Sequence, residues 1–140
     1  MDKPIISGDT IIIPSSQKHL VDVDLFIETA LRRFGTPEAL IPDIAISVSE
    51  IVNNAVMHGN KQAGDKVVTV QITRENNTVL ISVTDQGSGF DPSEIESPIE
   101  NENLLKAVGR GIFIVRSFMD TVEFRPGPDG TTVIIGKAIA

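Results

Sequence analysis

The chain has 140 residues, of which 41% are hydrophobic and 22% charged, an ordinary composition for one globular domain. A net charge of −7, with no basic run longer than Arg32-Arg33, argues against direct binding to nucleic acid or an anionic membrane. The absence of cysteine excludes disulfides and thiolate metal sites. The N-terminus lacks the apolar core of a signal peptide, and no apolar run approaches the roughly 20 residues of a membrane span. We therefore expect a soluble, cytoplasmic protein with a single domain over residues 1–140.

The first predicted elements are a short strand and two helices. The β-branched run Thr10–Pro14 predicts a strand, placed at a sheet edge because a proline closes it. A helix is expected after the capping serines 15–16, along an apolar stripe that runs to Phe34. A second helix is predicted over about residues 42–58, with a proline in its first turn and a glycine after its end.

The second half of the chain predicts a hairpin, an acidic loop, a third helix and two further strands. Residues 66–74 and 79–85 alternate in hydrophobicity around the turn sequence ENNT, a pattern typical of a β-hairpin. Turn-forming and acidic residues fill positions 87–103. The remaining elements are a helix at about 104–119 and strands at 121–124 and 131–139. These elements predict an α+β fold, a two-layer α/β sandwich with a mixed, mainly antiparallel sheet covered by helices on one face.

The end of the second predicted helix carries polar residues beside its apolar stripe. Helical spacing places Glu50 and Asn54 on one face, one turn apart. The amide oxygen of Asn54 is a hard ligand that suits Mg²⁺. The carboxylate of Glu50 can accept a proton from a water or hydroxyl that attacks a phosphoryl group. The alternative is a solvated polar face that ends in an Asn/His/Gly cap.

The sequence TDQGSGF, at residues 84–90, closes an apolar strand with Asp85 and continues with two glycines. Gly87 and Gly89 allow the backbone to approach a ligand or adopt a positive φ. A fixed carboxylate beside them can accept a hydrogen bond from an exocyclic amine such as that of adenine. The motif is neither a P-loop nor a dinucleotide fingerprint. An ordinary Asp-x-Gly turn after a strand is the alternative.

A third motif, GRGIFIV at residues 109–115, places two glycines near the start of the third predicted helix. In a helix interior each glycine costs about 1 kcal/mol against alanine. Gly109 and Gly111 therefore indicate a helix start whose bare N–H groups hold phosphate, with charge added by Arg110 and Lys106. The alternative is close packing of this helix on a neighbour. The phenylalanines at 113, 118 and 124 are expected in the core.

Together and in this order, the three motifs resemble the N-box and the two glycine boxes of the GHKL ATP-binding superfamily. Gly130-Thr131, at the start of the last predicted strand, matches a further feature of that superfamily. Within this superfamily, the chain is similar to the small bacterial anti-sigma factor serine/threonine kinases in its length and in the sequences SEIVNNAVMHG and GRGIFIVRSFMD. The resemblance implies the Bergerat fold over residues 1–140, with a lid at about 91–108.

The resemblance also implies a role for each site residue. Glu50 would be the general base, and Asn54 the ligand of Mg²⁺. Asp85 would hold the adenine amino group of ATP or ADP, with Thr131 assisting. The remaining contacts would come from Gly87 and Gly89 in the purine pocket, Gly109 and Gly111 in the phosphate turn, and the cations Lys106 and Arg110.

By the same resemblance the protein would sequester a sigma factor and phosphorylate a serine of an anti-anti-sigma (STAS-type) antagonist, acting as a homodimer. One departure favours an alternative, a nucleotide-gated binding module without efficient transfer. Residues 91–105 contain acidic side chains and no basic one, and Ala107 and Val108 stand where the family has an arginine. A histidine kinase is disfavoured because 140 residues leave no room for a two-helix phospho-acceptor domain. Gyrase-like and mismatch-repair ATPases are disfavoured because no transducer domain follows.

Overall fold

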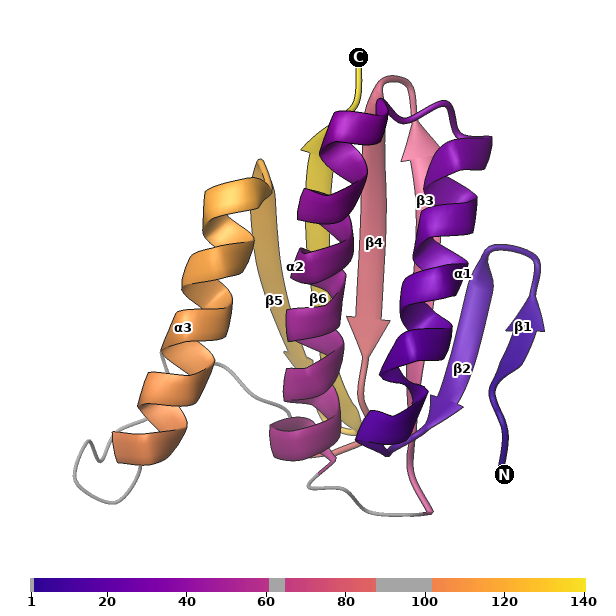
Figure 1. Cartoon of the computed structure of the whole chain (residues 1–140). Coiled ribbons are helices and arrows are strands. Elements are labelled where there is room, and N and C mark those ends of the chain that lie inside the picture. The colour runs from indigo at the N-terminus through magenta and orange to yellow at the C-terminus, as the bar shows by residue number, and fades with distance from the viewer. Residues whose placement is uncertain (1, 61–64, 88–101) are drawn as a thin grey trace.

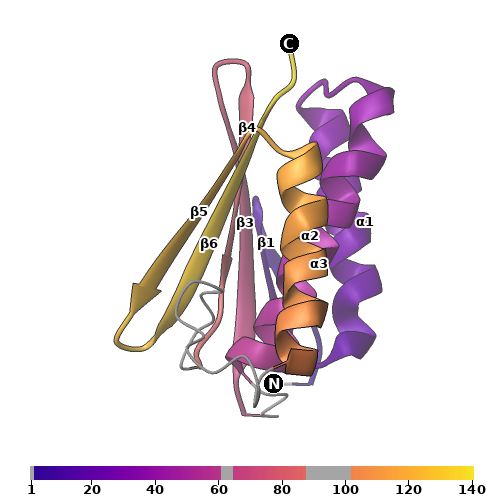
Figure 2. The same cartoon turned by 90° about the vertical axis from the view of Figure 1, so that its left-hand side faces the viewer.

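The computed structural model describes residues 2–60, 65–87 and 102–140; within these, the side chains of residues 58, 59 and 102–109 are not described. One six-stranded sheet has the order β1-β2-β3-β4-β6-β5, and three helices stand in front of it (Figure 1). Figure 2 shows all three helices on the same face of the sheet. The two-layer α+β sandwich is thus confirmed. All strand pairs among the described residues are antiparallel, so the expected mixed sheet is replaced by a fully antiparallel one there.

The helices α1, α2 and α3 span Leu20–Arg33, Ile41–Asn54 and Glu102–Phe118. The strands β1 to β6 span Ile5–Ser7, Thr10–Pro14, Val67–Glu75, Thr78–Thr84, Thr121–Gly127 and Gly130–Ala138. Short 3-10 turns at Gln17–His19 and Glu38–Leu40 precede α1 and α2, and a π-helical turn at Ala55–Gly59 follows α2.

The N-terminal hairpin differs from the sequence prediction. Strand β1, which is not predicted, pairs with β2 so that Ser7 lies opposite Thr10, and Gly8 takes a φ of +57° in the two-residue turn between them. Strand β2 therefore lies between β1 and β3, and its predicted place at the sheet edge is wrong. Pro14 is tolerated there because it occupies the last register position, where a missing N–H removes at most one ladder bond.

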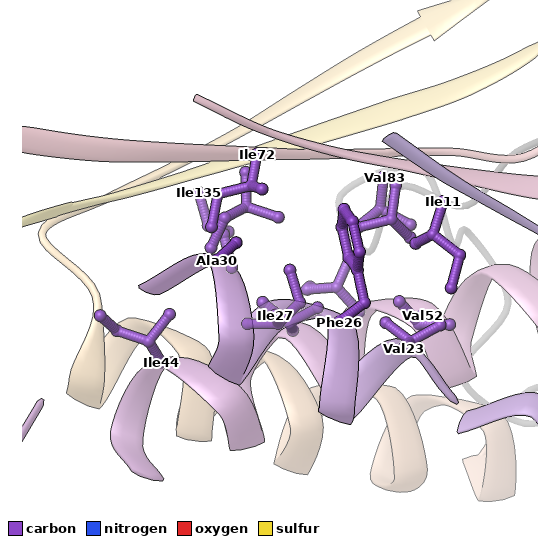
Figure 3. Packing of buried hydrophobic residues seen from close by; sticks show 14 of the residues in the cluster. Ile11, Val23, Phe26, Ile27, Ala30, Ile44, Val52, Ile72, Val83 and Ile135 are labelled. Carbon is purple, nitrogen blue, oxygen red and sulfur yellow. The ribbon is translucent and has the colours of Figure 1, made fainter. Parts of the chain in front are cut away.

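The core lies between the sheet and the inner faces of α1 and α2 (Figure 3). Val23, Phe26 and Ile27 of α1 are buried, as the apolar stripe predicts, and the Phe26 ring points at the strands. Each fully buried Val, Leu or Ile side chain stabilises the fold by about 1.5–3 kcal/mol. The facing strand residues are Ile11, Ile13, Val68, Val70, Ile72, Val79, Ile81, Val83 and Ile135.

Two expectations about apolar residues need correction. Phe113 is 72% exposed on α3 and lies outside the core, whereas Phe118 and Phe124 are partly buried. The helical stretch Glu38–Met57 reaches the length and mean hydropathy, 1.3, of a membrane span. Half of that window is buried, because α2 lies between α1 and α3 and packs on the sheet (Figure 1). Core packing accounts for its hydropathy.

Candidate functional site

The three sequence motifs meet at one end of the molecule. Strand β4 ends at Thr84, directly before Asp85, and β6 begins beside it at Gly130. The C-terminal end of α2, which carries Asn54, lies at this same lower end of the structure in Figure 1. Helix α3 runs alongside α2 (Figure 1) and brings the glycine motif to the polar face of that helix. Segments far apart in sequence thereby contribute to one site.

Asp85 is held at the end of β4 by hydrogen bonds from two directions. Its side chain is buried, with 5% exposure. Its Oδ1 atom accepts a hydrogen bond from the backbone N–H of Gly87 and another from that of Thr131, each at 3.1 Å. The N–H of Asp85 donates to the carbonyl oxygen of Thr131 at 3.0 Å. Within residues 2–60, 65–87 and 102–140 no side chain or N–H donates to Oδ2, so this oxygen can accept a bond from a ligand.

Burial raises the pKa of the Asp85 carboxyl above its usual range, because desolvation disfavours the charged form. The hydrogen bonds from Thr131 and Gly87 and the charge of Lys66 act in the opposite direction without cancelling this effect. An incompletely solvated carboxylate gains more from a ligand amine than an exposed one does. The electrostatics therefore suit an amine donor such as the adenine amino group.

Gly130 allows β6 to approach Asp85 closely. A Cβ atom at this position would lie 2.0 Å from the carbonyl oxygen of Asp85, and the φ of Gly130 is +157°. Both the space and the backbone conformation therefore require glycine. This contact explains the Gly130-Thr131 pair: the glycine lets the next residue place its N–H on the Asp85 carboxylate.

Gly111 joins the third motif to the first. A Cβ atom on Gly111 would lie 2.8 Å from Oε2 of Glu50 and 3.7 Å from Nδ2 of Asn54. Gly111 lies in the interior of α3, which begins at Glu102, so the expectation of glycines near the helix start is wrong. The alternative interpretation, close packing of this helix on a neighbour, is supported at Gly111. Its missing side chain makes room for the Glu50 carboxylate.

A small cavity lies between the first two motifs. Asn54 and Asp85 both line it, together with the apolar side chains of Ile51, Ala55, Val83, Phe124 and Val133. Its volume of about 20 Å³ is room for one water molecule. The lining, apolar with one carboxylate and one amide, has the composition of a small-molecule site.

The site offers few side chains that could bind a metal ion. No group of three or more His, Cys, Asp or Glu side chains gathers anywhere in the described part of the chain. Mg²⁺ commonly takes only one or two protein ligands and keeps waters and phosphate oxygens. The half-buried Asn54 amide, beside the Glu50 carboxylate, is a donor set of this kind. The residues present therefore fit Mg²⁺ held together with a nucleotide.

Several predicted site residues lie outside the described residues or away from the cavity. Gly89 and residues 91–101 of the expected lid are outside the described ranges. Lys106 and Gly109 belong to α3, but the side chain of Lys106 and the burial of both residues are not described. Arg110 is exposed on α3. Their expected roles stay predictions.

The structure adds residues that sequence reasoning missed. Asn60, only 1% exposed, accepts a hydrogen bond from the N–H of Gln86 at 2.8 Å and donates to the carbonyl oxygen of Val67 at 2.9 Å. Lys66 lies close enough to Asp85 to favour its charged form. The one sequence signal for Asn60 is its place after the glycine that stops the helix, and that signal does not identify its partners.

Comparison of the sequence with known proteins identifies the family of this chain. The sequence profile of the histidine kinase-like ATPase domain matches residues 13–137. An anti-sigma F factor of Bacillus licheniformis is 31% identical over 103 residues, which cover 71% of this chain and 70% of that protein. The serine-protein kinase RsbW of Staphylococcus aureus is 29% identical over 134 residues, covering 91% of this chain and 84% of the relative.

Solved structures share the fold. The RsbU and RsbW domains of a Mycobacterium tuberculosis protein match with a TM-score of 0.64 and 20% identity, over 94% of this chain and 33% of that one. The present chain thus spans about a third of that protein chain. A histidine kinase domain of Erythrobacter litoralis matches with a TM-score of 0.54 and 17% identity, over 91% of this chain and 62% of the other. At these identities the likeness concerns the fold alone.

Proposed function

Because this chain belongs to the histidine kinase-like ATPase family, and within it to the GHKL-type anti-sigma factor serine/threonine kinases, we propose that it binds Mg·ATP at Asp85 and phosphorylates a serine of an anti-anti-sigma antagonist. By its family the chain is an ATP-dependent protein kinase. Its proposed partners are a sigma factor, which it sequesters, and a STAS-type antagonist that releases it. We place this partner switch in the cytoplasm and assign it to a homodimer of the single domain 1–140.

The geometry of Asp85 is the observation that supports nucleotide binding most directly. The N–H groups of Gly87 and Thr131 both bind Oδ1, which orients the carboxylate and leaves Oδ2 to accept from the adenine amino group. A keto oxygen at the same place, as in guanine, would face this carboxylate with another acceptor. The site therefore favours adenine over guanine nucleotides.

The residues on α2 supply the transfer chemistry in this proposal. The Asn54 amide oxygen would hold Mg²⁺, which would offset the charge on the phosphates of ATP. Glu50 would accept the proton of the serine hydroxyl as its oxygen bonds to the γ-phosphorus and ADP leaves. Gly111 keeps space free beside the Glu50 carboxylate, because any larger residue would press on Oε2 at 2.8 Å.

Titration calorimetry with Mg·ATP and Mg·GTP tests the binding site. We expect the wild type to bind Mg·ATP in preference to Mg·GTP, and Asp85→Asn to weaken Mg·ATP binding about 10- to 100-fold, the range for a hydrogen bond to a charged group. Asp120→Asn is a matched control, because Asp120 also accepts a backbone N–H, that of Ala138, but does so at the other end of the sheet. Its affinity should equal that of the wild type.

Transfer of the labelled γ-phosphate to a STAS-type antagonist from the same genome tests the kinase activity. Glu50→Gln should bind Mg·ATP normally and lose about 10²- to 10⁴-fold in transfer rate, the usual contribution of a general base. Absence of adenine-nucleotide binding by the wild type would refute the proposal. Binding without transfer to any antagonist would instead support the nucleotide-gated binding module that the acidic residues 91–105 favour.

A further inference from the structure

We propose that Asn60 is a positioning residue for nucleotide recognition, which couples the end of the Asn54 helix to the Asp85 turn. This inference rests on the proposed function and identifies a residue that the motifs of the sequence do not contain. We call the contacts among Asn60, Val67 and Gln86 the Asn60 bridge. The Asn60 bridge connects three separate segments of the chain at the edge of the site.

The Asn60 bridge is a closed set of hydrogen bonds. The Oδ1 atom of Asn60 accepts from the N–H of Gln86 at 2.8 Å, and its Nδ2 atom donates to the carbonyl oxygen of Val67 at 2.9 Å. The side chain of Gln86 returns to the same strand, since its Oε1 atom accepts from the N–H of Val67 at 2.9 Å. Both backbone polar groups of Val67 are thereby bound by side chains of the bridge.

The bridge acts on Asp85 through the neighbouring peptide. The N–H that Asn60 binds belongs to the peptide unit between Asp85 and Gln86. The next N–H, that of Gly87, binds Oδ1 of Asp85. The orientation of the Asp85 carboxylate is thus fixed on one side by Thr131 and on the other by a turn whose backbone is held by Asn60. Loss of the Asn60 side chain would leave that turn held on one side only.

The bridge also reaches the helix that carries Asn54. The backbone N–H of Asn60 donates to the carbonyl oxygen of Ala55 at 2.8 Å, which closes the π-helical turn at the end of α2. Ala55 directly follows Asn54, and both line the cavity shared with Asp85. Asn60 therefore contacts the backbone beside both polar residues of the cavity.

The burial of Asn60 makes its amide sensitive to replacement. The residue is 1% exposed, so its replacement removes a buried acceptor from the Gln86 N–H and a buried donor from the Val67 carbonyl oxygen. No other side chain within the described ranges accepts from this N–H. A substitution to alanine removes both side-chain bonds and leaves the helix-closing backbone bond in place.

A double-mutant cycle on Mg·ATP affinity separates positioning from a merely structural role. Asn60→Ala is expected to raise the Kd for Mg·ATP about tenfold in the wild-type background and less than about threefold in the Asp85→Asn background, because the bridge acts through that carboxylate. Thermal melts of each variant give the folded fraction. Asp120→Ala, which removes one bond to a backbone N–H at the other end of the sheet, should lower the melting temperature without changing the Kd.

Each outcome bears on the inference. Equal fold-changes of Asn60→Ala in both backgrounds would overturn it, as would an unchanged Kd in the folded protein. If Asn60→Ala does not fold, Asn60→Leu decides the same question, since leucine fills similar space but neither accepts from the Gln86 N–H nor donates to the Val67 carbonyl oxygen. Wild-type affinity in folded Asn60→Leu would then refute the coupling, and a Kd about tenfold higher would support it. Failure of the wild type to bind Mg·ATP would refute the proposed function, and with it this inference.

Discussion

Gly111→Ala is expected to separate stability from activity in this protein. Gly111 lies in the interior of α3, where alanine is about 1 kcal/mol more favourable than glycine. The new Cβ would, however, lie 2.8 Å from Oε2 of Glu50, whereas ordinary contacts begin at 3.4 Å. The carboxylate must therefore withdraw by at least 0.6 Å (3.4 − 2.8). Asn54, 3.7 Å from the new atom, is already at an ordinary contact distance and need not move.

The two effects act on different measurements. The Glu50 carboxylate is the flexible end of a half-buried side chain, so its withdrawal costs little folding energy. A net gain of up to 1 kcal/mol corresponds to a melting temperature about 3–5 °C higher in a domain of this size. A misplacement of about 1 Å in a catalytic group can lower a rate about 100-fold. We expect unchanged or higher stability, unchanged Mg·ATP affinity and a transfer rate lower by about ten- to 100-fold.

Thermal denaturation, calorimetry and the phosphate-transfer assay on one protein preparation test this expectation. Ser117→Ala is the matched control, since it also replaces a residue of α3 by alanine but on the exposed face. Its transfer rate should equal that of the wild type. A fully active Gly111→Ala protein would refute the reasoning, because it would mean that the position of the Glu50 carboxylate does not limit transfer.

Three further substitutions test other contacts. Gly130→Ala would place a Cβ 2.0 Å from the Asp85 carbonyl oxygen, so we expect a loss of about 2–4 kcal/mol in thermal or urea denaturation and weaker Mg·ATP binding; wild-type stability would contradict the close approach. Because the pKa of Asp85 is raised in the folded protein, protonation of this group stabilises the fold fully below pH 3.8, the ordinary pKa of aspartate. This stabilisation is lost as the pH rises through the raised pKa. Asp85→Asn, neutral throughout, should therefore be more stable than the wild type at pH 7 in urea denaturation, with the difference vanishing below pH 3.8; lower stability at pH 7 would show that burial is not the dominant effect. Phe113→Ser should change the unfolding free energy by less than about 0.5 kcal/mol, since the ring is 72% exposed, and a larger loss would mean that it packs against the fold.

Local sequence patterns were sufficient for most elements of the fold. The alternation around Asn76 and Asn77 predicts the β3–β4 hairpin, and Asn76 indeed takes a positive φ of 56° in its turn. The apolar stripe of α1 and its stop before Gly35, at a φ of +78°, follow the same local rules. Strand β1 escaped prediction because it has only three residues, all exposed, although Gly8-Asp9 between two β-branched runs is a hairpin signal.

The parts of the site that the sequence does not predict depend on contacts between distant segments. Gly111 and Gly130 stand out in the sequence as glycines, but the sequence does not reveal their neighbours. Only the packing shows that Gly111 faces Glu50 and that Gly130 faces the backbone of Asp85. Asn60 lies 26 positions before the N–H that it binds, and nothing in its local sequence separates it from an ordinary loop asparagine. The exposure of Phe113 is likewise decided by which face of α3 meets α2.

The π-helical turn at Ala55–Gly59 limits where this chain can change length during evolution. Asn60 binds the carbonyl oxygen five positions earlier, so the turn contains one residue more than an α-helical turn does. A change of length that this turn does not absorb rotates the residues after it by about 100° per residue, which would turn the Asn60 side chain away from Gln86. Insertions and deletions should therefore accumulate at hairpin tips such as Asn76-Asn77, whereas the spacing between Asn54 and Asn60 should stay constant among proteins that keep this bridge.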